Sequence, residues 1–403
     1  MHEHVILFHG DLGTYERVLG VLLRCSLEMT ACRRYQFIVF LMGVFHLKMA
    51  CMDTLWRIFI DPGTSRLDVN SLLQFVAQYR PRETGKIGSD PGFRRMHEVI
   101  NHTGIALRLD AWRVKVEKRN CGISLKAFAR SEPTQELIEE IADYLAINYV
   151  AGYEANIFKL RGLASTLRDA QHENILIMHQ YFLLYEEISF AMNHGDIGRL
   201  ETLFPPWIYI FKATGKHRYA NLMVKFLTEV HFLYPDGLKH AVRYNLMVNP
   251  TGKEGAWQGA DWVEESNNLF AKARALWSMK CKLLICSLQH DFGGRGSNYT
   301  KAQVIEESPL VEIYRSCHHN IERNFNITGL TQQHGPPNLS KTFEVLATYF
   351  KTHSPNEHCN GRKSAHTILD MIDRGLNNIE PAADLPDDVD REIDAEDLEV
   401  ELL

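Results

Sequence analysis

The sequence predicts a mainly α fold, in which a large helical body carries a small α/β element at its N-terminal end. Apolar residues recur at the spacing of a buried helical face through most of the chain, as at Leu47, Cys51 and Leu55. Strand-like runs are found near the start, at residues 5–8 and 37–41, where β-branched and aromatic residues cluster. Two short strands followed by many helices indicate a helical protein with a small sheet.

The N-terminal element is predicted to be a strand–turn–helix unit. Residues 5–8 form the strand, residues 9–11 the turn, and residues 14–28 the helix. The second run, residues 37–41, leads directly into another helix. We therefore expect a small α/β region over residues 1–60.

Helices are predicted for most of the remaining chain. Their expected ranges are 68–79, 92–117, 134–150, 152–167, 171–193, 196–211, 216–233, 261–288, 300–325, 339–350 and 363–377. Turns rich in proline and glycine separate them, and one such break is expected at Pro205-Pro206. The expected regions are a helical body at 61–330, a short helical C-terminal region at 331–379 and an acidic disordered tail at 380–403.

The composition is that of an ordinary globular protein and excludes several classes. The longest apolar run, residues 37–45, falls short of the roughly 20 residues that a membrane span needs. The first residues lack the basic and apolar regions of a signal peptide. The eight cysteines contain no CxxC pair, as is typical of reduced thiols. We therefore expect an intracellular protein, nuclear or cytoplasmic, without membrane contact.

Charge is distributed unevenly along the chain. Residues 380–403 carry eleven acidic residues and one base, a net charge of −10, which leaves +4 on residues 1–379. A mildly basic body could bind DNA while the acidic tail competes for the same surface, or the tail could contact a basic protein partner.

Asp11 is the first candidate for a catalytic or metal-binding residue. It follows the first strand directly, where a carboxylate can bind a divalent cation such as Mg²⁺ or Mn²⁺. The alternative is structural, because an aspartate before a helix commonly accepts hydrogen bonds from the first-turn amides.

Two glutamates in the most apolar helix form the second candidate. Residues 171–193 are apolar around nearly the whole helix, which indicates burial, yet Glu186 and Glu187 interrupt the middle. A buried carboxylate requires a cation, a donor or water. Salt bridges to arginine or lysine satisfy this need, and so does a metal or acid–base site shared with Asp11 or Asp196.

The helix after the second strand carries a histidine near its start. His46 could be a ligand or a base there, or a core histidine whose nitrogens are satisfied. On the same face Asp53 and Arg57 are four residues apart and are expected to form a helix salt bridge.

A cluster of basic residues is the best candidate for binding nucleic acid. Its members are Arg80, Arg82, Lys86, Arg94 and Arg95, with Phe93 among them. Phosphate binding uses several mobile cations, and nearby aromatic rings can stack on bases. Solvated helix faces are the alternative explanation.

Several motifs of the chain resemble a known family. They include Gly10-Asp-Leu-Gly-Thr14, Phe45-His-Leu-Lys-Met49, Arg80-Pro-Arg-Glu-Thr-Gly-Lys86, Tyr181-Phe-Leu-Leu-Tyr-Glu-Glu187 and Gly195-Asp-Ile-Gly-Arg199. Together they are similar to a fungal family, the domain of unknown function numbered 6589, over about residues 10–315. Its association with mobile elements implies a transposon-derived protein.

The order strand, aspartate, helix, strand and histidine also resembles part of the ribonuclease H-like core of Mutator-type transposases. This resemblance implies that Asp11 is the core's second carboxylate and that Glu186, Glu187 or Asp196 is the third. Only ten residues precede Asp11, so the opening strands and first carboxylate of that core are expected to be missing. Residues 273–290 look like an insertion in the family pattern.

Two functions are therefore expected from the sequence. The first is a transposase-like, divalent-metal-dependent DNA-processing domain, truncated or inactive, in which Asp11 and Glu187 hold Mg²⁺ or Mn²⁺. The second is a helical scaffold or protein-binding module without catalysis, in which the glutamates pair with arginines.

Overall fold

The computed structural model describes residues 4–150, 157–263 and 338–377, together with positions 265, 313, 316, 317, 320, 323 and 324. Two compact units are present, the first comprising Met1–Asp261 and Leu339–Arg391 and the second Trp262–Asn338 and Glu392–Leu403. Nearly all described residues belong to the first unit. The insertion predicted at 273–290 and the acidic tail lie outside the described residues, as does the helix predicted at 300–325 apart from isolated positions.

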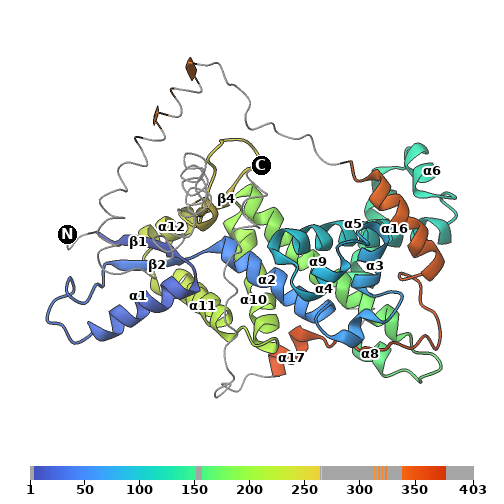
Figure 1. Cartoon of the computed structure of the whole chain (residues 1–403), viewed down its shortest axis with the longest axis horizontal. Coiled ribbons are helices and arrows are strands. Elements are labelled where there is room, and N and C mark those ends of the chain that lie inside the picture. The colour runs from blue at the N-terminus through green and yellow to red at the C-terminus, as the bar shows by residue number, and fades with distance from the viewer. Residues whose placement is uncertain are drawn as a thin grey trace, which may run out of the picture. The chain divides into compact units, whose positions relative to one another are not determined.

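The described chain is mainly α with two small sheets, which confirms the predicted fold class (Figure 1). The strands are β1 (Ile6–Gly10), β2 (Ile38–Met42), β3 (Met247–Val248) and β4 (Gln258–Gly259). The helices are α1 (Leu12–Arg24), α2 (Val44–Phe59), η1 (Gly63–Arg66), α3 (Leu72–Tyr79), α4 (Thr84–Ser89), α5 (Gly92–Lys118), α6 (Leu125–Arg130), α7 (Gln135–Leu145), η2 (Ala146–Val150), α8 (Ile157–Arg161), α9 (Ala170–His194), α10 (Ile197–Ala213), α11 (His217–Thr228), η3 (Glu229–Leu233), α12 (Asp236–Tyr244), α16 (Ser340–His353) and α17 (Met371–Asn377). None of these described helices has the length and apolarity needed to cross a lipid bilayer.

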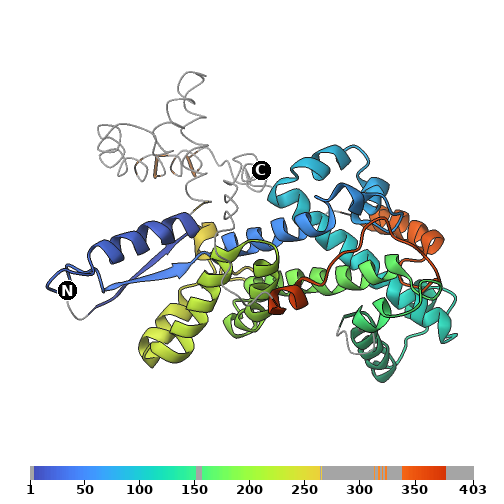
Figure 2. The same cartoon turned by 90° about the horizontal axis from the view of Figure 1, so that it is seen from below.

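The N-terminal element is a parallel strand pair with a helical connection. β1 and β2 pair in register from Ile6 opposite Ile38 to Gly10 opposite Met42, and α1 connects them. The ring of Tyr15 on α1 packs against Phe40 of β2, with ring centroids 5.1 Å apart. β2 runs straight into α2, which extends from the sheet into the helical body (Figure 2). The sheet therefore presents its carboxyl edge to the first turn of α2.

The helical body is built around α9, which contacts α2, α5 and α10. α9 is apolar around its circumference, as predicted, and its Phe182 meets Phe59 of α2 edge to face at 5.4 Å. α5 approaches α9 closely at Gly104, where a Cβ atom would lie 2.5 Å from Oε1 of Glu186. Glycine at this position leaves room for the glutamate between the two helices.

One predicted break is wrong, whereas the helix range predicted across it, 196–211, agrees with α10. Pro205 and Pro206 lie inside α10, which continues through both to Ala213. Each proline removes a helical hydrogen bond, but Phe204, Trp207 and Phe211 of the same helix are fully buried. Burial of these large side chains outweighs the local preference for a turn.

Residues 339–377, called the C-terminal arm below, pack on the first part of the chain. α16 contacts α3 and α5, and α17 lies on α10 so closely that a Cβ on Gly375 would be 2.0 Å from the carbonyl oxygen of Tyr209. The helix predicted at 363–377 is shorter than expected, because residues 363–370 are irregular and only α17 is helical.

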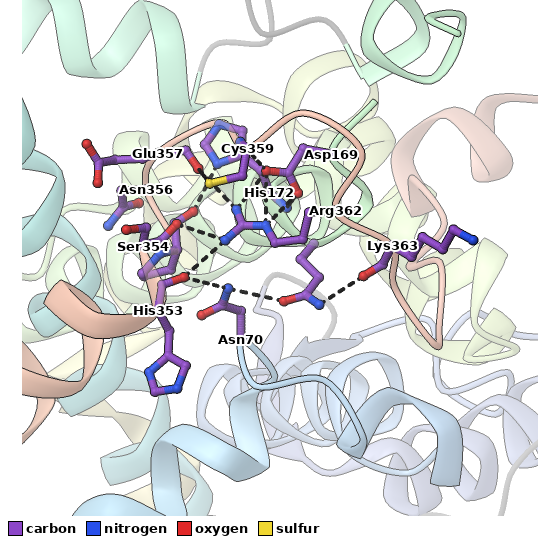
Figure 3. A network of polar contacts seen from close by, with 12 residues as sticks. Asn70, Asp169, His172, His353, Ser354, Asn356, Glu357, Cys359, Arg362 and Lys363 are labelled. Carbon is purple, nitrogen blue, oxygen red and sulfur yellow. Dashed lines mark hydrogen bonds and ion pairs between the residues drawn. The ribbon is translucent and has the colours of Figure 1, made fainter. Parts of the chain in front are cut away.

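The irregular segment of the arm is fixed by polar contacts (Figure 3). Arg362 binds the buried carboxylate of Asp169, with Nε 2.8 Å from Oδ1 and Nη2 2.7 Å from Oδ2. The amide of Asn356 accepts from His179 and donates to Asp110. Periodicity does not predict this segment because side chains far apart in sequence hold it.

Candidate functional site

The carboxyl edge of the parallel strands brings two helix N-termini together. Gly10 ends β1 and is followed by Asp11 and α1, while Met42 ends β2 and is followed by Gly43 and α2. The amide of Gly43 donates to the carbonyl of Gly10 at 3.0 Å, so the two turns are adjacent. In open α/β sheets, ligands bind outside this edge.

Asp11 caps α1, and its carboxylate stays accessible. Its Oδ1 accepts the amide of Thr14 at 2.7 Å, which is the capping role considered as the alternative. Burial raises the pKa of Asp11, but the hydrogen bonds from Thr14 and the charges of His46 and Arg17 outweigh it and hold the pKa below its ordinary value. The residue is exposed, so an ionised carboxylate faces solvent at this edge.

Asp261 caps α2 from a distant part of the sequence. Its buried carboxylate accepts the amides of Phe45 at 3.2 Å and His46 at 3.0 Å. Gly43 and Gly259 provide the space for it, since a Cβ on either would lie 2.4 or 2.5 Å from an Asp261 oxygen. Asp261 was not predicted from the sequence. The signal for it was Gly43, which precedes α2 and has no side chain that could cap the helix.

The same aspartate orients His46. The ring Nδ1 lies 2.9 Å from Oδ2 of Asp261, and the His46 side chain is 16% exposed. In neutral histidine this contact assigns the proton to Nδ1 and the lone pair to Nε2. Asp261 and His46 are thus hydrogen-bonded, and Asp11 lies near enough for the charge of His46 to lower its pKa. These three residues at the edge of the sheet are called the carboxylate–imidazole–carboxylate series below.

The two glutamates of α9 are each paired with an arginine. Glu186 binds Arg108 of α5 through two contacts, at 3.0 Å and 2.5 Å. Glu187 accepts from Nε of Arg199 at 2.7 Å. Burial raises the pKa of Glu186, although Arg108 opposes this shift. The salt-bridge alternative thus describes both side chains, and their predicted role in chemistry stays a prediction.

Asp196 caps α10 in the way that Asp11 caps α1. Its Oδ1 accepts the amide of Arg199 at 2.9 Å, so Arg199 contacts both Asp196 and Glu187. Asp196 also lines a hollow between α10 and α12. Glu187 and Asp196 therefore share Arg199, whereas Asp11 and Glu186 each have other partners. Among the described residues no three His, Cys, Asp or Glu side chains form a metal-binding group.

The predicted basic cluster is partly neutralised. Arg80 and Arg94 bind Glu98, and Arg95 lies 3.9 Å from Glu83. Arg82 and Lys86 are exposed, and no described acidic group pairs with them. These two cations are the part of the cluster that remains available to a phosphate.

The predicted Asp53–Arg57 salt bridge is present. Oδ2 of Asp53 lies 2.8 Å from Nε of Arg57 and also 3.0 Å from Nζ of the buried Lys216. One carboxylate thus pairs with two cations at this point of the helical body.

The residues at the sheet edge suit a hard divalent cation held by few protein ligands. Asp11 could supply a carboxylate oxygen, the kind of ligand that Mg²⁺ and Mn²⁺ prefer, and His46 could supply an imidazole nitrogen. Mg²⁺ commonly takes one or two carboxylates and completes its shell with water and substrate phosphate.

Comparison with known proteins identifies a family. A family model described as a family of unknown function, DUF6589, matches residues 1–334. Neither curated proteins nor solved structures give a match.

Proposed function

Because the chain belongs to the family of unknown function DUF6589, which brings no assigned activity, we propose a function from the geometry of the sheet edge. The chain is a DNA-processing protein derived from a transposase-like domain of fungal mobile elements. It acts inside the cell, and a divalent cation, Mg²⁺ or Mn²⁺, binds at Asp11. The supporting observation is the series Asp261–His46–Asp11 beside the carboxyl ends of β1 and β2.

The roles of the residues follow from their contacts. Asp11 is ionised and exposed, so it supplies the negative charge that attracts the cation. Asp261 holds the ring of His46 by Nδ1, so that Nε2 is the atom that accepts a proton or contacts the cation. When bound, a divalent cation neutralises phosphate charge and lowers the pKa of water. Arg82 and Lys86 provide further attraction for the DNA backbone.

The test is binding of Mn²⁺ to matched variants, measured by titration calorimetry. Asp11→Asn keeps the helix cap, because asparagine caps as well as aspartate, but removes the charge. Asp143→Asn is the control, because Asp143 is an exposed aspartate on α7 that has no proposed role in the site. We expect Asp11→Asn to lose Mn²⁺ binding and Asp143→Asn to retain it. Equal binding by wild type and Asp11→Asn would remove Asp11 from the site.

His46→Asn tests the second member of the series. Its amide nitrogen can replace Nδ1 in the hydrogen bond to Asp261, while the position of Nε2 is left empty. Loss of a ligand or of its supporting contact typically weakens metal affinity about 10- to 100-fold. We expect a loss in that range, together with an unchanged circular dichroism spectrum.

Glu186, Glu187 and Asp196 keep their predicted roles as further members of the site. Glu187, the second predicted metal ligand, would have to exchange its contact with Arg199 for the cation. Glu187→Gln in the Mn²⁺ titration tests this step. A loss of affinity as large as that of Asp11→Asn would support it.

The paired glutamates favour a second function, a helical scaffold that binds a protein through its acidic tail. Salt dependence separates the two proposals. DNA affinity that falls steeply with salt and rises when residues 380–403 are deleted supports DNA processing. Absence of DNA binding at low salt supports the scaffold.

A further inference from the structure

A hollow lies between the start of α10 and α12. Its volume is about 500 Å³, within the range of small-molecule sites. Its walls are Gly195 and Asp196, one face of α12 from Asp236 to Tyr244, and Trp257. Trp257 precedes β4, which leads directly to Asp261. The hollow is thus connected through β4 to Asp261, within the same first unit.

Aromatic rings form much of its lining. The indole of Trp257 lies against Gly195, where a Cβ would be 2.6 Å from Cδ2 of the ring. Gly195 also has φ +67°, so two independent features require glycine beneath the indole. At the rim, the rings of His240 and Tyr244 have centroids 4.4 Å apart, and Tyr244 is 69% exposed. An exposed tyrosine beside an open hollow offers a flat apolar face to a ligand.

The polar groups of the hollow divide into paired and unpaired ones. Arg243 is bound by Glu201 through two contacts, at 2.7 Å and 3.1 Å. By contrast, Lys239 and Asp236 have no ion-pair partner among the described residues. Lys239 is therefore the cation left to meet a phosphate, and Asp236 is an acceptor for the N–H groups of a planar ring.

We propose that this hollow binds an unstacked nucleobase of a single nucleic acid strand. The base stacks on the tyrosine and tryptophan rings, its flanking phosphate meets Lys239, and Asp236 accepts from its edge. This inference rests on the proposed function, because it gives the strand at the Asp11 site a second point of attachment. Stacking with little base discrimination is expected, since every base has an aromatic face.

The test compares two strands of equal length that differ only in their bases. The probes are a fluorescently labelled oligothymidylate of about a dozen nucleotides and its abasic counterpart, with binding read by fluorescence anisotropy in EDTA. We expect the full-length chain to bind the thymidine strand about tenfold more tightly than the abasic strand. Tyr244→Ser should remove most of this preference and leave affinity for the abasic strand unchanged. Tyr35→Ser, at another exposed tyrosine, is the matched control and should keep the preference.

Lys239→Gln tests the phosphate contact separately. It should weaken binding of both strands and lower the slope of log affinity against log salt by about one unit. Lys341→Gln, at an exposed position of α16, is its matched control and should change neither value.

Equal affinity of the wild type for the two strands overturns the proposal, and so does a preference that survives Tyr244→Ser. Because EDTA removes divalent cations, the result does not depend on Asp11. Failure of Mn²⁺ binding with a persisting base preference would refute the cation site alone.

Discussion

Replacement of Arg362 by alanine should destabilise the protein more than loss of any other single ion pair described above. The Asp169 side chain is fully buried, and Arg362 neutralises it with two short contacts (Figure 3). Removing the cation leaves that carboxylate with the backbone amides of His172 and Cys359 as its donors. Breaking a buried pair by removing one partner costs about 3–5 kcal/mol.

The same arginine also holds the irregular segment of the C-terminal arm in place. It donates to the carbonyl oxygens of His353, Ser354 and Glu357 at 3.0 to 3.1 Å. Arg362→Ala should therefore release the segment after α16 as well as lower the free energy of unfolding. Urea unfolding monitored by circular dichroism measures the second effect, and the rate of proteolysis within residues 354–370 measures the first.

The control is an exposed ion pair. Arg33 lies 4.0 Å from Glu28, with 72% and 48% of the two side chains exposed. Arg33→Ala should change the free energy of unfolding by less than about 1 kcal/mol, as exposed pairs usually do. A loss below about 1 kcal/mol for Arg362→Ala as well would refute the reasoning. It would mean that the backbone amides of His172 and Cys359 are sufficient to stabilise the buried carboxylate of Asp169 without the arginine.

Three further predictions follow from other parts of the structure. Burial lowers the pKa of His179 to about 4 and that of His97 to about 3, so below pH 6.5 the unfolded chain binds protons that the folded chain does not. The free energy of unfolding should therefore fall by roughly 1 kcal/mol per pH unit for each histidine as the pH drops from 6.5 towards 4. A urea midpoint that stays constant over this range would contradict the prediction. Arg108→Gln should cost about 1–3 kcal/mol in urea unfolding, because it leaves the half-buried carboxylate of Glu186 without its cation. An unchanged midpoint would show that the pair contributes nothing to stability. Arg82→Gln should reduce the salt slope of duplex DNA binding by about one unit and weaken all sequences alike, whereas a sequence-dependent loss would indicate a base contact instead.

The elements with clear periodicity could be predicted from the sequence, and those fixed by distant contacts could not. The spacing of apolar residues located α5 and α9 to within a few residues. The same reasoning placed a break at Pro205-Pro206, because it weighs local preference and cannot weigh the burial of Trp207 beside it. The irregular part of the C-terminal arm has no local signal, since its anchor is the pairing of Arg362 with a residue far away in sequence.

In the candidate site too, some residues could be predicted from the sequence and others could not. Asp11 and His46 could be selected because each stands at the junction of a strand-like run with a helix. Asp261 could not be selected, because it caps α2 from more than two hundred positions further along the sequence. Sequence spacing also left the partners of Glu186 open, and the structure supplies Arg108 from a neighbouring helix.

The most direct test of the proposed cation site is to locate a bound cation. Crystals grown or soaked with Mn²⁺ and measured near the manganese absorption edge would reveal the ion by its anomalous scattering. The account predicts a peak at the carboxyl edge of β1 and β2, roughly 2.1 to 2.2 Å from a carboxylate oxygen of Asp11, and none in crystals of Asp11→Asn. A peak elsewhere, or an unchanged peak in Asp11→Asn, would contradict it.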